Sequence, residues 1–334
     1  MTRGDFKQKL RSGALPSVMI FEGDDEYLKQ SAIKDLEKVL LPPGLESLNR
    51  SLLTNPETSD IIDAAETLPV MAAKRLVIVR DMAALTGRAE TDDRLIDYLK
   101  TLPETCVLVF HCVGKPDARK KLYLGVKKAN GVVTFAPMKD RELTAFVISA
   151  FKDLGKACTE QTADLLIFTV GTDTALLLSE IGKITYHTND AAVTDDDVRA
   201  LATPSSECTV FQMIDAVASG GSDRALKLMR AQLLAGEDRF GLLAMLQWQY
   251  RLLRQIKQLQ AERVPESGIR QQLGVPPFSA AQYMRHASRY TLPQLVTAVG
   301  ICSKAEVGMK SGRLPVEGTL ESVMLKLLRL KEIA

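Results

Sequence analysis

The feature that most constrains the fold of this chain is an abrupt change in hydrophobic periodicity near Lys139. Before this point, short apolar runs alternate with segments whose apolar residues recur at helical spacing. Beyond it, the helical spacing alone continues. Alternating strands and helices are typical of a parallel sheet flanked by helices. The sequence therefore predicts an α/β domain followed by all-helical structure.

The expected strands are continuous apolar runs, the pattern of strands covered on both faces. They lie at 17–21, 76–79, 107–110 and 132–135. A helical stripe over 26–40 ends at Pro42 and Pro43. In the helical part, Thr194 and the three aspartates after it predict a helix N-terminus.

The domain organisation follows from these patterns and from a Pro- and Ser-containing stretch at 201–207, which indicates a linker. We expect an α/β domain at 1–140, a small helical domain at 141–206 and a helical domain at 207–334. A length of 334 residues fits two or three domains.

Composition narrows the class of protein. Hydrophobic residues make up 46% and charged residues 25% of the chain, as in globular proteins. The 43 basic and 41 acidic residues give a net charge of +2. A protein that binds DNA without partner subunits is expected to have a larger positive excess. The first ten residues lack the apolar stretch of a secretory signal, and no run approaches the roughly 20 residues of a membrane span. We expect a soluble, cytoplasmic protein with no membrane partner.

The segment 23–30 lies where a phosphate-binding P-loop would follow the first strand. Gly23 and Lys29 match the first glycine and the lysine of GxxxxGK[ST], but Leu28 replaces the second glycine and Gln30 the magnesium-binding hydroxyl. Carboxylates at 24–26 would repel a triphosphate, and Asp81 lacks an adjacent glutamate to orient water. We name residues 23–30 the P-loop remnant and expect it to bind no nucleotide.

No other catalytic or metal site is indicated. The three histidines are far apart in sequence, and none belongs to a recognised nucleophile or zinc motif. The five cysteines are scattered, without a CxxC pair. We therefore expect no catalytic residues, no metal and no cofactor.

Several segments, in order along the chain, closely resemble the delta-subunit family of bacterial DNA polymerase III clamp loaders. They are FEGDDEYL at 21–28, LPVMAAKRLVIVRD at 68–81, KPDARKKLY at 115–123, GTD at 171–173, LSEIGKI at 178–184, VFQMIDA at 210–216 and QYRLL at 249–253. The resemblance implies an AAA+-like first domain without a working P-loop, a small helical domain and a helical collar.

The same resemblance implies partners and a role. The partners are the beta sliding clamp, the gamma/tau and delta prime subunits in a pentamer, and primer–template DNA reached through the assembled complex. The role is to bind the clamp and open its ring for chromosomal replication, while partner subunits hydrolyse ATP. The chain would thus be a non-catalytic subunit of a DNA polymerase holoenzyme, a nucleotidyltransferase complex.

In this family, the helix before the strand that ends at Arg80 and Asp81 leads to two apolar residues that enter a hydrophobic pocket on the clamp. The matching residues here are Val70 and Met71, with Leu68 and Pro69 beside them. We name residues 68–71 the apolar loop. Methionine adapts its shape to such a pocket. The alternative is that Leu68, Val70 and Met71 are core residues preceding a strand.

A run of basic residues adds a further hypothesis. Lys115, Arg119, Lys120 and Lys121, followed by lysines at 127 and 128, have only Asp117 as an acidic neighbour in sequence. This basic run could contact DNA phosphates, or it could be a solvated helix face or a subunit contact. Two other functions stay open from the residues: an active P-loop ATPase and a stand-alone DNA-binding protein.

Overall fold

The computed structural model describes the whole chain except residues 88–89, 91, 274–276 and 331–334. It divides into two compact units, residues 1–137 and residues 138–334. The unit boundary is near the predicted end of the α/β domain. The division of the helical part at 206/207 stays a prediction.

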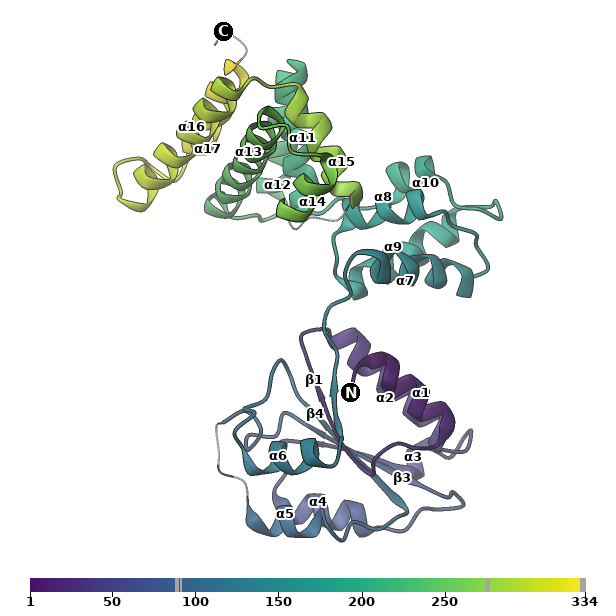
Figure 1. The fold of residues 1–334 in the computed structure, drawn as a ribbon. Helices are drawn as coiled ribbons and strands as arrows, with labels where there is room; N and C mark the ends of the chain where they lie inside the picture. The colour runs from purple at the N-terminus through teal and green to yellow at the C-terminus, as the bar shows by residue number, and fades with distance from the viewer. Residues whose placement is uncertain (88–89, 91, 274–276, 331–334) are drawn as a thin grey trace. The chain divides into compact units, whose positions relative to one another are not determined.

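The first unit contains a five-stranded parallel sheet in the order β2-β3-β4-β1-β5 (Figure 1). Its strands are β1 (Val18–Glu22), β2 (Arg50–Thr54), β3 (Arg75–Arg80), β4 (Cys106–His111) and β5 (Val132–Thr134). Every residue of β4 is buried, as expected of a central strand with helices on both faces.

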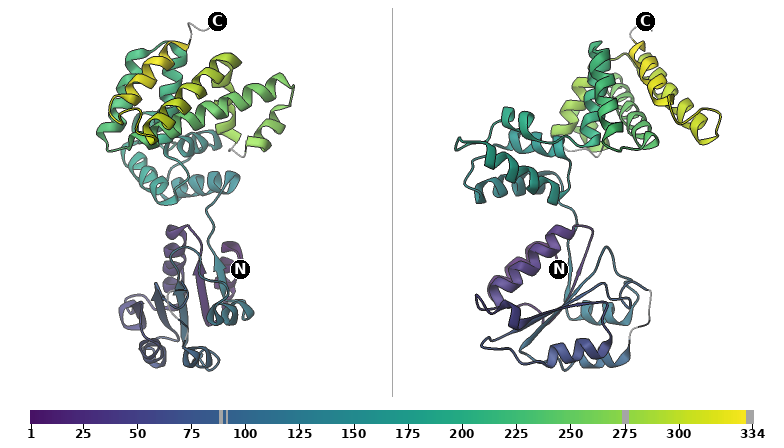
Figure 2. Two further views of the ribbon diagram at one scale, coloured as in Figure 1. Left: turned by 90° about the vertical axis from the view of Figure 1, so that its left-hand side faces the viewer. Right: turned by 180° about the vertical axis from the view of Figure 1, so that it is seen from behind.

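Helices cover both faces of the sheet, as Figure 2 also shows. They are α1 (Arg3–Ser12), α2 (Glu26–Leu40), α3 (Glu46–Asn49), α4 (Thr58–Glu66), α5 (Asp93–Tyr98) and α6 (Lys121–Lys128). Helix α2 spans the predicted 26–40. Asp25 is its N-cap, accepting a hydrogen bond from the Leu28 N–H.

Alternate residues of the strands supply the two cores of this unit. On one face, Ile20 belongs to a cluster with the buried residues of α4, α5 and α6. On the other face, the rings of Phe6, Phe21 and Phe135 pack together, with Phe6 and Phe21 edge to face at 5.4 Å.

In the second unit, the regular elements among the described residues are all helices, apart from an isolated bridge between Ala157 and Ala192. Its helices are α7 (Asp140–Asp153), α8 (Glu160–Val170), α9 (Thr174–His187), α10 (Asp195–Leu201), α11 (Ser206–Ser219), α12 (Ser222–Leu234), α13 (Arg239–Ala261), α14 (Glu266–Leu273), α15 (Pro277–Ser288), α16 (Leu292–Lys310) and α17 (Thr319–Leu328). The predicted fold class, α/β followed by all-α, is confirmed.

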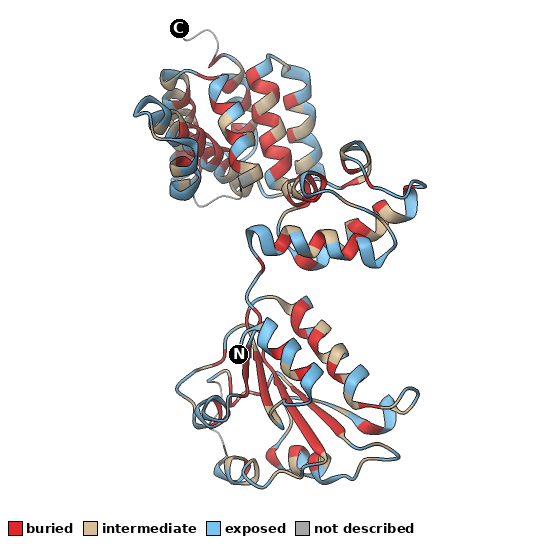
Figure 3. Cartoon of the chain, turned by 45° about the vertical axis from the view of Figure 1, so that its right-hand side comes forward, coloured by how far each residue is buried: buried red, intermediate tan, exposed pale blue. Residues whose placement is uncertain are grey.

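One large core joins the helices from α11 to α17. Figure 3 shows buried positions as stripes along the helices, the pattern of amphipathic segments. Phe168 of α8 extends this core, because its ring lies edge to face with Phe211 at 5.0 Å.

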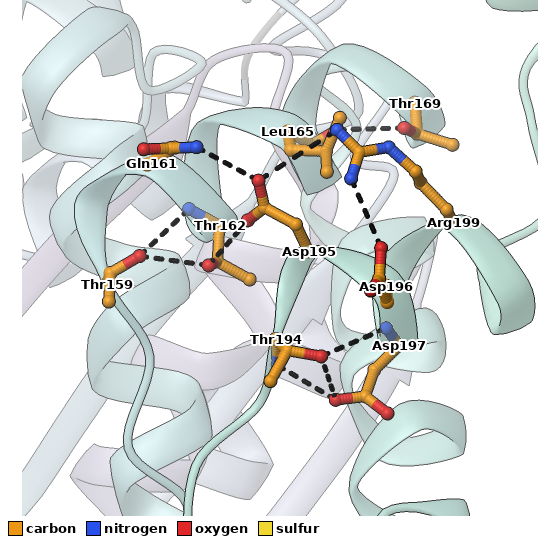
Figure 4. A network of polar contacts seen from close by, with 10 residues as sticks. All are labelled: Thr159, Gln161, Thr162, Leu165, Thr169, Thr194, Asp195, Asp196, Asp197 and Arg199. Atoms are coloured by element: carbon orange, nitrogen blue, oxygen red, sulfur yellow. Dashed lines mark hydrogen bonds and ion pairs between the residues drawn. The ribbon is translucent and has the colours of Figure 1, made fainter.

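A polar network joins the N-terminal ends of α8 and α10 (Figure 4). The Thr162 hydroxyl donates to the Asp195 carboxylate at 2.8 Å, and the Gln161 amide donates to the same side chain at 3.0 Å. Thr194 caps α10 through a reciprocal capping box with Asp197, which confirms the predicted helix start. The network provides hydrogen-bond partners for polar groups at the start of both helices.

Among the described helices, none is by itself long and apolar enough to cross a bilayer. Helices α8 and α9, bent by 119° at their junction, reach that length and apolarity only as a pair.

Candidate functional site

The P-loop remnant connects β1 to α2 at the edge of the sheet where the parallel strands end. Gly23 has a φ of 115° and its N–H donates to the Gly114 carbonyl at 3.1 Å. Asp25 accepts from the Leu28 N–H at 2.9 Å. A phosphate-binding loop needs its backbone N–H groups free for the ligand, and here these two already have protein partners.

The Lys29 side chain points inward and is fully buried. Its ammonium group donates to the Cys112 carbonyl at 2.5 Å and lies 2.9 Å from the Glu26 carboxylate. In a working P-loop the lysine binds the terminal phosphates. Here the Glu26 carboxylate provides the negative charge that pairs with Lys29.

The Glu26 carboxylate also faces two groups from the ends of neighbouring strands. It lies 2.8 Å from His111 Nε2, which is not aligned for a hydrogen bond, and 3.8 Å from the Arg80 guanidinium. The pKa of Glu26 is lowered overall. Burial raises this pKa, but the hydrogen bond from Lys29 and the charge of His111 lower it by more, so the carboxyl is held ionised. Burial lowers the pKa of His111 despite the nearby Glu26.

A cavity of about 470 Å³ remains at this edge, lined partly by Asp24, Lys29, Arg80 and Asp81. Leu28 is buried in the helix, whereas Gln30 is exposed and reaches back to Glu26 at 3.4 Å. Of the three carboxylates expected to repel a triphosphate, those of Asp24 and Glu26 line this cavity, Glu26 also pairing with Lys29, while Asp25 caps α2. The residues present do not fit a nucleoside triphosphate with magnesium.

The apolar loop lies at the opposite edge of the same sheet, where the chain passes from α4 into the start of β3. Leu68 is 75% exposed, Val70 44% and Met71 85%, while Pro69 is half-buried. The alternative that Leu68, Val70 and Met71 are core residues is wrong. Three apolar side chains exposed within four residues are the kind of feature that marks a contact site.

The backbone of the apolar loop is held by a residue that the sequence analysis did not single out. Asn49, fully buried at the end of α3, accepts from the Val70 N–H at 2.7 Å and donates to the Val70 carbonyl at 3.0 Å. Met71 follows with a φ of 49°, in the left-handed region that residues other than glycine rarely adopt. No pattern in the sequence links residues 49 and 70.

The basic run is more neutralised than its sequence indicates. Arg119 pairs with Asp117 at 3.0 Å, and the fold brings Glu90 to within 3.1 Å of Lys120 and Asp93 to within 2.8 Å of Lys121. The Arg119 hydrogen bonds lower the pKa of Asp117 to about 2. Lys115 is exposed near the same segment. Contact of this run with DNA stays a prediction.

The three histidines lie in different surroundings. His111 and His286 are buried, and His187 is exposed on α9. Within the described ranges, no three or more His, Cys, Asp or Glu side chains gather in a way that could hold a metal ion.

Comparison with known proteins places the chain in a family. The family model "DNA polymerase III, delta subunit" matches residues 19–136, and "DNA polymerase III delta subunit, C-terminal domain" matches residues 207–327. The DNA polymerase III subunit delta of Bacillus subtilis (strain 168) is 25% identical over 338 residues, covering 98% of this chain and 97% of that protein.

A solved structure shares the fold. The Bacillus subtilis DNA clamp loader delta protein, YqeN, matches with a TM-score of 0.56 and 24% identity, over 98% of this chain and 99% of that one. The two family models together cover more than half of the chain, on both sides of the boundary between the two units. This chain therefore belongs to the family of DNA polymerase III delta subunits.

Proposed function

We propose that this protein is the clamp-loader subunit that binds the sliding clamp and stabilises its open ring. Its assembly partners are then the gamma/tau and delta prime subunits, which hydrolyse the ATP, and primer–template DNA reaches the protein through the complex. The observation that carries the proposal is the apolar loop, whose Leu68 and Met71 side chains are exposed in a chain of this family.

The free energy available from burying the apolar loop fits this role. Full burial of one Leu or Met side chain is worth roughly 1.5–3 kcal/mol, so two anchors supply several kcal/mol to a preformed pocket. A ligand shifts an equilibrium only by the difference between its affinities for the two states. The apolar loop therefore favours the open ring to the extent that it binds the pocket of the open clamp more tightly than the pocket of the closed clamp.

The state of the P-loop remnant supports a mechanical role. Lys29 and the Leu28 N–H are already bonded within the protein, so this subunit has no nucleotide cycle of its own to drive the opening. An active P-loop ATPase is disfavoured by the same contacts. A stand-alone DNA-binding protein is disfavoured because acidic residues pair with Arg119, Lys120 and Lys121 of the basic run.

The test measures binding of the purified full chain to the sliding clamp of the same species on a surface sensor. Met71→Asp places a charge in the pocket but suits the left-handed backbone, and we expect an affinity loss of about 100-fold or more. Val70→Asp is the second variant. A fluorophore pair across the clamp interface reports ring opening, which should fall in parallel.

Val113→Asp is the matched control, because Val113 is also an exposed apolar loop residue, 64% exposed, but lies at the other edge of the sheet. It should bind the clamp as the unmodified chain does. Unchanged affinity in both Met71→Asp and Val70→Asp would overturn the proposal, as would a folded unmodified chain that does not bind the clamp.

A further inference from the structure

The side chain of Asn49 makes hydrogen bonds to backbone on two sides. Its Nδ2 donates to the Leu45 carbonyl of its own segment at 3.0 Å and to the Val70 carbonyl at 3.0 Å, while its Oδ1 accepts from the Val70 N–H. One amide thus pairs with both polar groups of Val70, as a neighbouring strand would. Because the Asn49 side chain bonds only to the backbone of Val70, these bonds fix the path of the loop and leave the side chain of Val70 free.

A second residue, Arg75, holds the end of the segment that follows the apolar loop. Arg75, the first residue of β3, is buried, and its Nε donates to the Ala64 carbonyl in the last turn of α4 at 3.0 Å. Its Nη1 donates to the Leu48 carbonyl at 3.0 Å, directly beside Asn49. The segment between α4 and β3 is therefore attached to the sheet at Arg75 and to α3 at Val70.

The attachment at Val70 comes immediately before the strained residue. Left-handed backbone at a residue other than glycine is strained and persists only where its surroundings impose it. Asn49 supplies that constraint, since Val70 cannot rotate without breaking two hydrogen bonds at once. Met71 consequently projects from a fixed point, at 85% exposure, and does not fold back onto the sheet.

We propose that Asn49 is a positioning residue that preorganises the apolar loop for its partner. This inference rests on the proposed function, in which the apolar loop enters a pocket on the sliding clamp. A loop that samples other conformations binds with an affinity reduced by the fraction of time it spends in the competent one. Asn49 touches no partner itself and acts through Val70 and Met71.

The experiment combines clamp affinity with amide hydrogen exchange of the full chain. Asn49→Ala leaves every apolar side chain of the loop intact, yet we expect clamp affinity to fall about tenfold, because the freed loop must be ordered on binding. Exchange of the Val70 amide should accelerate at least about tenfold, since its acceptor is gone. Exchange in β4 should not change.

A double-mutant cycle separates positioning from general destabilisation. In a Met71→Ala background, Asn49→Ala should weaken the clamp affinity less than about twofold, because the side chain that it positions is absent. Asn49→Asp is the second variant. Its carboxylate can still accept from the Val70 N–H, but a buried oxygen now faces the two carbonyl oxygens to which Asn49 donated, so we expect a loss at least as large as that of Asn49→Ala.

Asn55→Ala is the matched control, because Asn55 also accepts a hydrogen bond from a loop backbone, the Ala83 N–H at 3.1 Å. It should change neither clamp affinity nor Val70 exchange. Equal affinity losses with and without Met71, or an unchanged Val70 exchange rate, would overturn the inference. If Met71→Asp and Val70→Asp both leave clamp binding intact, the proposed function fails, whereas Val70 exchange still tests whether Asn49 holds the loop.

Discussion

The ammonium group of Lys29 lies 2.9 Å from the carboxylate of Glu26, one turn earlier in α2, and the Lys29 side chain is fully buried. A buried charge is stable only when it is paired and hydrogen-bonded. Glu26 and the Cys112 carbonyl meet that requirement within the protein. The lysine of the P-loop remnant is therefore a structural residue.

Replacement of Lys29 should accordingly reduce stability without removing an activity. Lys29→Ala deletes the buried stem and leaves Glu26 and the Cys112 carbonyl without their donor. Because Glu26 is partly exposed, we expect a loss of about 2–3 kcal/mol in the free energy of unfolding, measured in urea. Lys34→Ala, at an exposed position of the same helix, should change it by less than about 0.5 kcal/mol.

The same variant tests the enzyme alternative. We expect the purified chain to release no phosphate from ATP above the background of a buffer control, with or without magnesium. ATP hydrolysis by the unmodified chain that Lys29→Ala abolishes would contradict this structural interpretation and restore the active P-loop ATPase.

His286 makes the stability of the helical unit depend on pH. Its ring stacks on Phe211 at 3.8 Å, and its Nε2 lies 3.3 Å from the Asp215 carboxylate. Burial lowers its pKa from 6.5 to about 4, outweighing the attraction of Asp215, and the charges of Arg289 and Arg285 also lower it. The unfolded chain therefore binds a proton at higher pH than the folded chain does.

The sign of the effect follows from this order of protonation. Stability contributed by neutral His286 is complete above about pH 6.5 and falls as the pH drops from 6.5 to 4, by up to about 3 kcal/mol. Urea unfolding can be followed by the fluorescence of Trp248, the single tryptophan, whose ring lies 6.3 Å from that of Tyr283 in this unit.

His286→Leu should remove most of this pH dependence, whereas His187→Leu, at an exposed position of α9, should retain it. A pH profile that is the same for His286→Leu and the unmodified chain would show that another group controls acid stability.

The sequence predicted the parts of the fold that have a continuous local signal. The apolar runs of β1, β3, β4 and β5 and the stripe of α2 fall in this class. Strand β2 was missed, because it lies at the sheet edge with alternating burial and contains Arg50, Ser51 and Thr54. An edge strand that is only half covered has no continuous apolar run to detect.

The candidate sites, like the fold, were predictable from the sequence only where the signal is local. Loss of the P-loop motif was visible in Leu28 and Gln30, but the contact that fills the site joins Lys29 to a carbonyl 83 residues away. The Asn49–Val70 pair, 21 residues apart, likewise depends on how β2 and β3 lie side by side. The acidic partners of Lys120 and Lys121 are Glu90, which precedes α5, and Asp93, the first residue of α5, so the basic run seemed less neutralised in sequence than it is in the fold.

Gly23 is the position of the P-loop remnant where the fold itself requires glycine. Its φ is 115°, and an added Cβ would lie 2.2 Å from the Phe135 carbonyl oxygen, which is rigid backbone next to β5. Gly23→Ala therefore combines backbone strain with a steric clash, and we expect a loss of about 3 kcal/mol or more in the free energy of unfolding.

The control for this last variant is Gly125→Ala in α6, where an added Cβ meets no neighbour within 4 Å. Alanine should stabilise this helix by about 0.5–1 kcal/mol, so the two substitutions are expected to act in opposite directions. Scanning calorimetry of the first unit's transition measures both. A Gly23→Ala chain as stable as the unmodified chain would mean that Phe135 and the β1–α2 turn can move apart, and that the glycine here serves no structural need.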